Sequence, residues 1–447
     1  MPGGALGHAY EWLRAHPRAA VAAALLIAPA FLLRDAILGL GALYQRDIHL
    51  YWHPEAEAFV RSVAAGSWPV WERTFGFGQP LLANSSAQVL YPLTWLNLLI
   101  RPWWYYTVFV LFHLVLSAAG MYVACRRLEC SRMAAIAGAV LWTACGPFLS
   151  FTILWHHFAG AAWLPWVLAA ALHLGAARTS RAALGLALVL AAQVLAGSFD
   201  MAVMGGATAA AAILWRLSWP RPWQAPDRRL LVAAAGAAAL AVGLSAAQWM
   251  PTMELALRSG RRALPRETRT YWSVHPISVA DLVLPGFSAT APVSANAKKA
   301  LFEDREPFLA SLYLGLPAMS LVAAGLLDRR RGAAVLGAAG GAALLVALGR
   351  HTPVYEAIVS VLPPLQAFRY PVKAMVVVAL CWCILAGMGV DVLRRRGARH
   401  RHASLVRGVA FGAVLLAALG AAGLARAGAD RGARHLAMAA VMAARLS

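Results

Sequence analysis

Long apolar runs alternate with short basic or polar segments along most of the chain, and this pattern predicts membrane-spanning helices. A spanning helix needs about 20 predominantly apolar residues to cross the hydrocarbon core of a bilayer. The runs predict eleven spans, with approximate cores at 18–38, 104–124, 133–151, 158–175, 182–198, 201–217, 230–250, 308–327, 333–349, 372–391 and 405–425. We therefore predict an all-α polytopic membrane protein that forms one integral membrane domain over residues 1–447.

The composition agrees with this class. The chain is 61% hydrophobic and 13% charged, whereas a soluble domain is about half apolar and about a quarter charged. The formal net charge of +21 is compatible in principle with nucleic-acid binding. The arginines, however, occur in short clusters between apolar runs, where they set membrane topology. Nucleic acid is therefore not an expected partner.

The distribution of arginines predicts the orientation. Clusters fall on every second connection, on the side of Arg14 and Arg18, at 126–132, 178–181, 216–229, 329–331 and 394–401. The positive-inside rule then predicts a cytoplasmic N-terminus and an external C-terminus. Two longer polar segments, 42–103 and 251–306, face outward together with "LWHHFAG" and "FRYPVK", so polar chemistry gathers on one side of the membrane.

The first outward loop is rich in acids, histidines, tryptophans and prolines. Pro54 favours a helix start and Gly66 a helix end, with Phe59 and Val63 on one face. Such an amphipathic helix is expected to lie on the membrane surface. It would hold the segment that contains Asp47 near the lipid headgroups.

Asp47 is the candidate base, because burial among aromatic residues raises the pKa of a carboxyl and suits it to accept a proton from a hydroxyl. The alternative is an interfacial ion pair with Arg46 and no catalysis, which spacing alone favours. Asp200, in "GSFD", is a further outward acid without an assigned role.

Two other groups bear on chemistry. His156 and His157 point in different directions on a helix, which suits hydrogen bonding to a substrate better than metal ligation. The five cysteines have no metal-ligand spacing and are expected to be buried hydrophobes, so no metal site is predicted.

"FRYPVKAM" suggests an anion site. Pro371 suits the first position of a helix, with Lys373 in its first turn and Arg369 just before it. Cations oppose the positive end of a helix dipole, so a bound phosphate would relieve their repulsion. Snorkelling of both side chains toward lipid headgroups is the equally weighted alternative. Contact with anionic lipid or with an acidic acceptor is open to the arginines of 258–269, and a solvated basic surface is favoured for most of them.

Five strings together resemble the YfhO family of bacterial membrane proteins. They are "RDIHLYWHPEAEAF", "GSWPVWERTFGFGQPLLANSSAQVLYPLTWLN", "GPFLSFTILWHHFAGAAWLPW", "FLASLYLGLPA" and "LGRHTPVYEAIVSVLPPLQAFRYPVK". Members of the family are similar to GT-C class glycosyltransferases of the inner (cytoplasmic) membrane, which use polyprenyl-phosphate sugars at the outer face. They are usually longer and carry a C-terminal extracytoplasmic domain, so the resemblance implies that this chain is a short member or a fragment.

The resemblance implies a GT-C-like bundle and an inverting sugar transfer to an envelope glycan, lipid or protein. Asp47 matches the acidic catalytic position in the first outward loop. Arg369 and Lys373 would hold the lipid phosphate, without a metal or other cofactor. The remaining expected substrate contacts are His156, His157, Trp52, Trp71, Tyr91, Asn84 and Gln88. The three aromatic residues among them serve equally well as interface anchors.

Two non-enzymatic classes compete with this interpretation. A flippase or transporter of lipid-linked sugars predicts charged groups deep within the spans. An assembly scaffold needs no outward acid at all.

Overall fold

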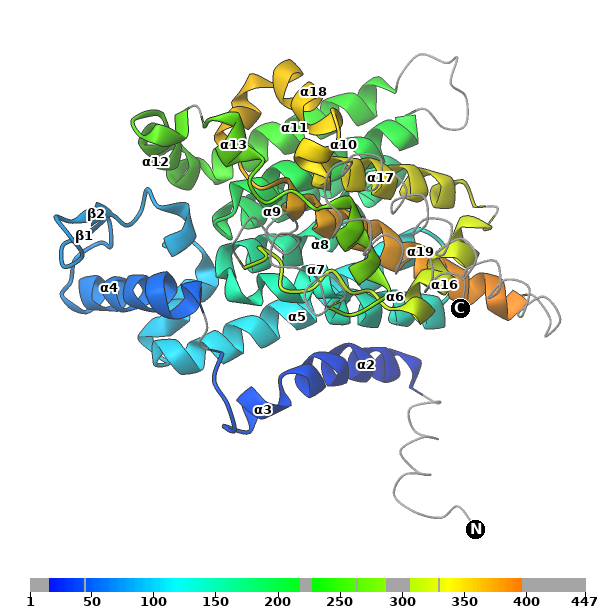
Figure 1. Cartoon of the computed structure of the whole chain (residues 1–447), viewed down its shortest axis with the longest axis horizontal. Helices are drawn as coiled ribbons and strands as arrows, with labels where there is room; N and C mark the ends of the chain where they lie inside the picture. Colours follow the sequence, from blue (N-terminus) through cyan, green and yellow to red (C-terminus); the bar gives the residue numbers. More distant parts are fainter. Residues whose placement is uncertain are drawn as a thin grey trace, which may run out of the picture.

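The computed structural model describes residues 16–43, 46–217, 227–262, 264–286, 306–328 and 330–395, and it is mostly helical (Figure 1). The helices are α2 (Pro17–Leu32), α3 (Arg34–Ile37), α4 (His53–Ala64), α5 (Pro102–Arg127), α6 (Arg132–Ala144), α7 (Gly146–Leu149), α8 (Trp155–Ala177), α9 (Ser180–Leu195), α10 (Phe199–Leu217), α11 (Arg228–Leu244), α12 (Ala246–Leu257), α13 (Arg266–Arg269), α16 (Leu316–Leu326), α17 (Arg331–Ala347), α18 (Val354–Val361) and α19 (Met375–Arg395). A π-helical turn, Ile48–Trp52, precedes α4, and 3-10 turns lie at Ser85–Ala87, Pro92–Leu98, Ser150–Ile153, Gly260–Arg262, Pro276–Leu282, Gly349–His351, Pro363–Ala367 and Pro371–Ala374. Two short antiparallel strands, β1 (Trp71–Glu72) and β2 (Gln79–Pro80), pair Trp71 with Pro80.

The coarse prediction of a helical membrane protein agrees with these elements. In the part of the chain that the structure describes, three helices are long and apolar enough to cross a membrane: Trp104–Arg127, Trp155–Ala177 and Pro371–Arg395. Two bent pairs, α6 with α7 and the following turn, and α11 with α12, raise this number to five if each pair is one span. Eleven spans are not confirmed, and the predicted span at 405–425 lies outside the described residues.

Two predicted spans differ from the observed helices for local reasons. The first run breaks after Leu32, where Leu33 has φ −102° and ψ 12°, outside the helical range; Pro29 lies inside α2 and removes one of its backbone hydrogen bonds. The run at 308–327 becomes helical only at Leu316, because Gly315 has a φ of 97° that a helix does not accept. Both helices are therefore shorter than the apolar runs that predicted them.

The core of the bundle is built on two central helices. α19 packs against α16, α17 and α6, and α8 packs against α10, α5 and α9. Small residues permit the closest approach: a Cβ added at Gly325 or Gly389 would overlap the backbone carbonyl oxygen of Leu385 or Leu321, respectively. In a bilayer the lipid tails are as apolar as the side chains, so the hydrophobic effect does not drive helices together. Close packing of this kind stabilises helix pairs there instead.

We expect Gly389→Ala to destabilise the bundle by about 1–3 kcal/mol, because the added methyl group meets rigid backbone at α16. Gly341→Ala is the matched control, since a Cβ at Gly341 meets nothing within 4 Å. Alanine in place of a helical glycine should be neutral or stabilising there, by about 0.5–1 kcal/mol. Thermal unfolding of both variants in detergent checks the pair. Equal melting temperatures for the two variants would show that the α16–α19 contact is loose.

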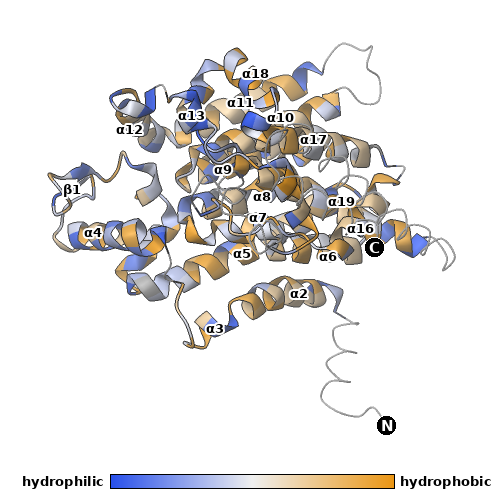
Figure 2. Ribbon diagram, in the orientation of Figure 1, coloured by the Kyte–Doolittle hydropathy of each residue, from blue (hydrophilic) through white to orange (hydrophobic). Residues whose placement is uncertain are grey.

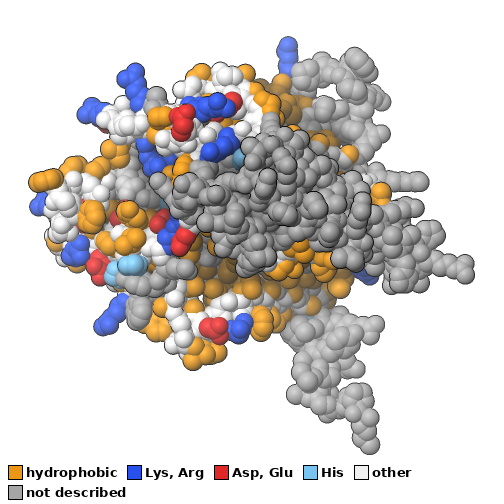
Figure 3. All heavy atoms as spheres, viewed as in Figure 1, with side chains coloured by type: hydrophobic (Ala, Val, Ile, Leu, Met, Phe, Trp, Pro, Cys, Tyr) orange, Lys and Arg blue, Asp and Glu red, His pale blue; other side chains and the backbone are white. Residues whose placement is uncertain are grey.

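The elements of the predicted outward segments gather at one end of the bundle. α4, β1 and β2 of the first loop lie there, at the left of Figure 1, with α12 and α13 of the second. Figure 2 shows hydrophobic helices through the centre and hydrophilic residues concentrated in these peripheral elements. On the face seen in Figure 3, charged side chains are visible over this end.

Candidate functional site

A buried ion pair joins two helix starts at the centre of the candidate site. The Nζ atom of Lys373 lies 2.9 Å from Oδ1 of Asp200, and the two side chains are 4% and 19% exposed. Asp200 lies in the first turn of α10, where the helix dipole favours a carboxylate. Lys373 belongs to the 3-10 turn Pro371–Ala374 that leads into α19. The anion beside Lys373 is therefore a carboxylate of the protein itself, whereas the sequence suggested a bound phosphate or lipid headgroups.

Two arginines add positive charge around this pair. Arg369 and Arg261 interact electrostatically with Lys373, and Arg261 also interacts with Asp200. Burial, and secondarily the proximity of Arg369, lowers the pKa of Arg261. Within the described residues neither arginine forms an ion pair of its own. Three cations thus share one carboxylate, which leaves local positive charge for an anion. Sequence reasoning had assigned Arg261 to a solvated surface.

Three aromatic side chains, Trp272, Phe308 and Tyr370, form an aromatic cluster against Lys373. The ring of Tyr370 lies 4.5 Å from Trp272 and 5.3 Å from Phe308, centroid to centroid. The Lys373 ammonium lies 5.4 Å from the Tyr370 ring and 5.6 Å from the Phe308 ring, within cation–π range. Tyr370 has a φ of 70°, and its N–H donates to the carbonyl of Arg269 at 2.7 Å. That bond ties the second outward loop to the start of α19.

The two predicted histidines lie next to this cluster at the start of α8. His157 Nδ1 is 2.7 Å from the hydroxyl oxygen of Ser198, and its ring is 6.0 Å from Phe308. His156 interacts electrostatically with Lys373, and its buried Nδ1 has no hydrogen-bond partner. The described residues include no group of three or more His, Cys, Asp or Glu side chains positioned to hold a metal ion. Of the two, His157 is therefore held by Ser198, whereas His156 keeps a buried ring nitrogen without a hydrogen-bond partner.

Asp47 lies at the edge of the same region. Its Oδ1 is 3.8 Å from Nε of Arg46, and its side chain is 30% exposed. Burial raises the pKa of Asp47 above its usual value, and Arg46 opposes that effect. The Arg46 guanidinium lies 5.9 Å from the Trp272 ring, so Arg46 connects Asp47 to the aromatic cluster. Among the described residues no hydrogen bond or ion pair joins Asp47 directly to Lys373.

Most of the other first-loop residues expected to contact substrate instead hold the loop on the bundle. Gln88 donates to the carbonyl of Ala196 at 2.6 Å, and the Tyr91 hydroxyl is 2.8 Å from Nε2 of His113. Trp52 is 5% exposed and stacks on Tyr105. These contacts show how a polar loop laid over helices satisfies its own buried polar groups, and substrate binding by these residues stays a prediction.

Trp71 and Asn84 have different surroundings. Trp71 is 50% exposed in β1. Asn84 Nδ2 donates to Oε1 of Glu55 at 2.7 Å, while the buried Oε2 of Glu55 has no partner. Glu55 is thus, after Asp47, a second carboxyl of the first loop whose pKa is raised by burial.

We expect the stability of the fold to depend on pH through Glu55. Burial raises the pKa of Glu55 to about 8, so the folded state holds a proton that the unfolded chain has released above pH ~4.5. Stability should therefore fall as pH rises from about 5 to about 8, by at most roughly 5 kcal/mol. Melting temperatures in detergent of wild type and Glu55→Gln, compared across this range, measure the effect. Glu57→Gln, at a side chain that is 48% exposed, should keep the wild-type slope; an unchanged slope in Glu55→Gln would contradict the assignment.

An apolar groove runs along the bundle from this charged site. It has a volume of about 460 Å³ and is lined by side chains of α8, α10, α17, α18 and α19. Its lining includes Asp200, Tyr355 and Phe368, and also Leu128, which directly follows α5, and Trp215, near the C-terminal end of α10. Asp200 is the one charged residue among the described lining residues. The groove thus combines a long apolar wall with a single acid that is paired to Lys373.

The chain has no match among known protein families or curated proteins. The resemblance to the YfhO family therefore rests on the quoted sequence strings, and the functional argument rests on the geometry of this site.

Proposed function

We propose that the protein is a membrane glycosyltransferase that moves a sugar from a polyprenyl-phosphate donor to an extracytoplasmic acceptor. The observation that carries the proposal is the apolar groove that reaches the Asp200–Lys373 pair. A polyprenyl-phosphate joins a long hydrocarbon tail to one anionic group, and the groove and the surrounding cations offer the matching surfaces. The resemblance to the YfhO family, similar to the GT-C class, supports the same assignment.

In the proposed complex the tail lies in the groove and the phosphate faces Arg369, Arg261 and Lys373. Lys373 then exchanges part of its interaction with Asp200 for the phosphate. Charge-assisted hydrogen bonds to the phosphate are the strong ones, and arginine forms them bidentately. The exposed ring of Trp71 and the aromatic cluster offer faces on which a sugar can stack.

The proposed reaction is a direct displacement with inversion. The acceptor hydroxyl oxygen attacks the anomeric carbon, and its proton passes to the Asp47 carboxylate. The bond from the anomeric carbon to the phosphate oxygen breaks, and its electron pair stays on the departing lipid phosphate. Cations that face this phosphate stabilise the charge that grows there in the transition state.

A substitution in the groove tests the function. Proteoliposomes with labelled polyprenyl-phosphate sugar and an envelope fraction as acceptor should form labelled product with the wild-type protein. Ala207 lines the groove, and Ala207→Trp should lower product formation roughly tenfold or more by filling it. Ala210→Trp is the matched control, at an exposed residue of α10 outside the groove lining. Equal activity of the two variants would remove the groove from the mechanism.

A flippase is the second candidate, and the buried Lys373–Asp200 pair favours it, because charges buried among membrane helices often mark transport paths. The same proteoliposomes separate the two functions. A flippase moves the labelled donor to the other leaflet and forms no labelled acceptor, whereas a transferase forms the product.

A further inference from the structure

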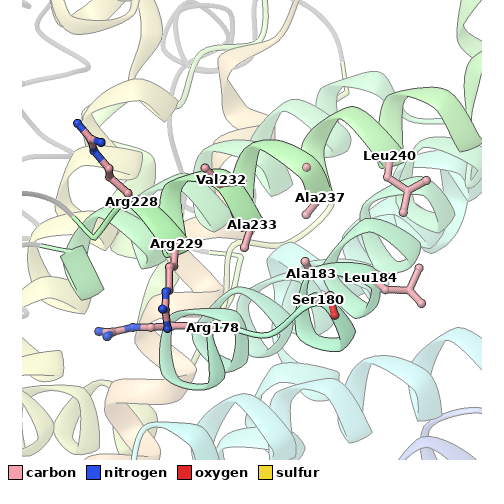
Figure 4. A pocket seen from close by; sticks show the side chains of 11 residues that line it. Arg178, Ser180, Ala183, Leu184, Arg228, Arg229, Val232, Ala233, Ala237 and Leu240 are labelled. Carbon is pink, nitrogen blue, oxygen red and sulfur yellow. The ribbon is translucent and has the colours of Figure 1, made fainter.

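A second groove, between α9 and α11, belongs to a different part of the molecule from the proposed active site. It has a volume of about 590 Å³. Its lining residues are Arg178, Ser180, Ala183, Leu184, Arg228, Arg229, Val232, Ala233, Gly236, Ala237 and Leu240 (Figure 4). Charged side chains lie at one end only, where α9 and α11 both begin, and the remaining wall is almost entirely apolar.

The charged end has more cations than its acid neutralises. Asp227 Oδ2 pairs with a guanidinium nitrogen of Arg178 at 2.8 Å, and Asp227 Oδ1 accepts from the backbone N–H groups of Arg229 and Leu230. Arg229 extends toward Arg178 in Figure 4. Within the described residues the Arg229 side chain forms no ion pair. The positive ends of two helix dipoles add to this field.

The apolar wall faces outward from the bundle. Val232 is 72% exposed, Leu184 46% and Leu240 41%. From Arg228 to Leu240, α11 rises about 18 Å at about 1.5 Å per residue, close to the ~15 Å that one leaflet contributes to a hydrocarbon core. The groove therefore has the length of one acyl chain, with its cations where a headgroup phosphate would lie.

We infer that this groove binds an anionic phospholipid of the surrounding bilayer, with an acyl chain along α11 and the phosphate between Arg229 and Arg178. The surplus of positive charge selects an anionic over a zwitterionic headgroup. The apolar wall selects a lipid over a soluble phosphate. The site is separate from the polyprenyl-phosphate site proposed above and does not depend on it.

The test measures lipid retention. The full chain, purified from nanodiscs of equal parts phosphatidylglycerol and phosphatidylcholine with identical acyl chains, is analysed for bound lipid by native mass spectrometry. Wild type should retain phosphatidylglycerol preferentially, and Arg229→Gln should reduce that preference roughly fivefold. Arg181→Gln is the control, because Arg181 is an exposed arginine of α9 that does not line the groove. Equal losses in the two variants would mean that overall charge, not this site, selects the lipid, and would overturn the inference.

A second variant tests the apolar wall. A Cβ at Gly236 meets nothing within 4 Å, so Gly236→Leu places a side chain in the groove without a backbone clash. The leucine side chain should displace the lipid while Arg229 remains in place. Normal lipid retention by Gly236→Leu would contradict the proposed path of the acyl chain. Millimolar glycerol phosphate should not displace the lipid from wild type; displacement would show a site for the anion alone and would also overturn the inference.

Discussion

Replacing Asp47 by asparagine is expected to lower sugar transfer roughly 10²–10⁴-fold, the usual cost of removing a general base. The amide has nearly the shape of the carboxyl but accepts no proton from the acceptor hydroxyl. The Asp47 side chain forms only a 3.8 Å ion pair with Arg46, so expression and melting temperature should remain near wild type. Initial rates in the proteoliposome assay, with labelled polyprenyl-phosphate sugar, measure the loss.

Asp35→Asn is the matched control for this prediction. Asp35 also pairs with the arginine that precedes it, at 3.6 Å, and its side chain is 66% exposed. It should transfer sugar at the wild-type rate. The pH profile adds a second readout: burial raises the pKa of Asp47, so the wild-type rate should rise with pH through a value above 3.8, as the carboxyl ionises. Turnover by Asp47→Asn close to wild type would transfer the role to another acid, Glu55 first.

The second large effect concerns the buried ion pair. Lys373→Met is expected to destabilise the protein by about 3–5 kcal/mol, because it leaves the Asp200 carboxylate without its partner. Adding Asp200→Asn should restore most of that loss, since the double variant buries no uncompensated charge. Thermal unfolding of the two single variants and the double variant gives the coupling energy of the pair. A stable Lys373→Met protein would show that Asp200 finds another cation, for which Arg261 is a candidate because it interacts electrostatically with Asp200.

Activity of the same variants separates a structural lysine from one that binds phosphate. The double variant, folded but uncharged at this position, should use the polyprenyl-phosphate donor poorly, and Lys373→Arg should retain part of the activity because the charge remains. Wild-type donor use by the double variant would restrict Lys373 to a structural role and leave phosphate recognition to the two arginines.

Local sequence patterns predicted much of the helical architecture but not the partners within the site. Apolar runs and the arginine clusters predicted a helical membrane protein, and Pro54 and Gly66 predicted the helix that the structure has as α4. Apolarity alone did not separate a straight span from one broken after Leu32 or delayed by Gly315. Whether these helices form eleven spans stays untested.

The site itself depends on contacts between segments far apart in the chain. Lys373 was predicted to meet an anion, yet its partner is Asp200, and no pattern near either residue indicates the other. Gln88 was named among the expected substrate contacts, and no local pattern indicates that its amide donates to the carbonyl of Ala196, more than a hundred residues away. Long-range pairing of this kind is set by how helices pack, which hydrophobic periodicity constrains only weakly.

Three hydrogen bonds, one buried and two partly buried, hold the first loop on the bundle, and this limits how a large substrate reaches the groove. Gln88 donates to Ala196, Trp155 donates to Ser86, and Gln248 donates to Leu82. Raising the loop like a lid would break all three bonds and leave buried carbonyls unsatisfied, at about 1–3 kcal/mol each. The groove instead has an exposed rim, where Val203 is 42%, Ile358 36% and Leu362 53% exposed. A lipid would then slide in sideways from the bilayer, and its rate of arrival would follow membrane fluidity rather than the opening of the loop.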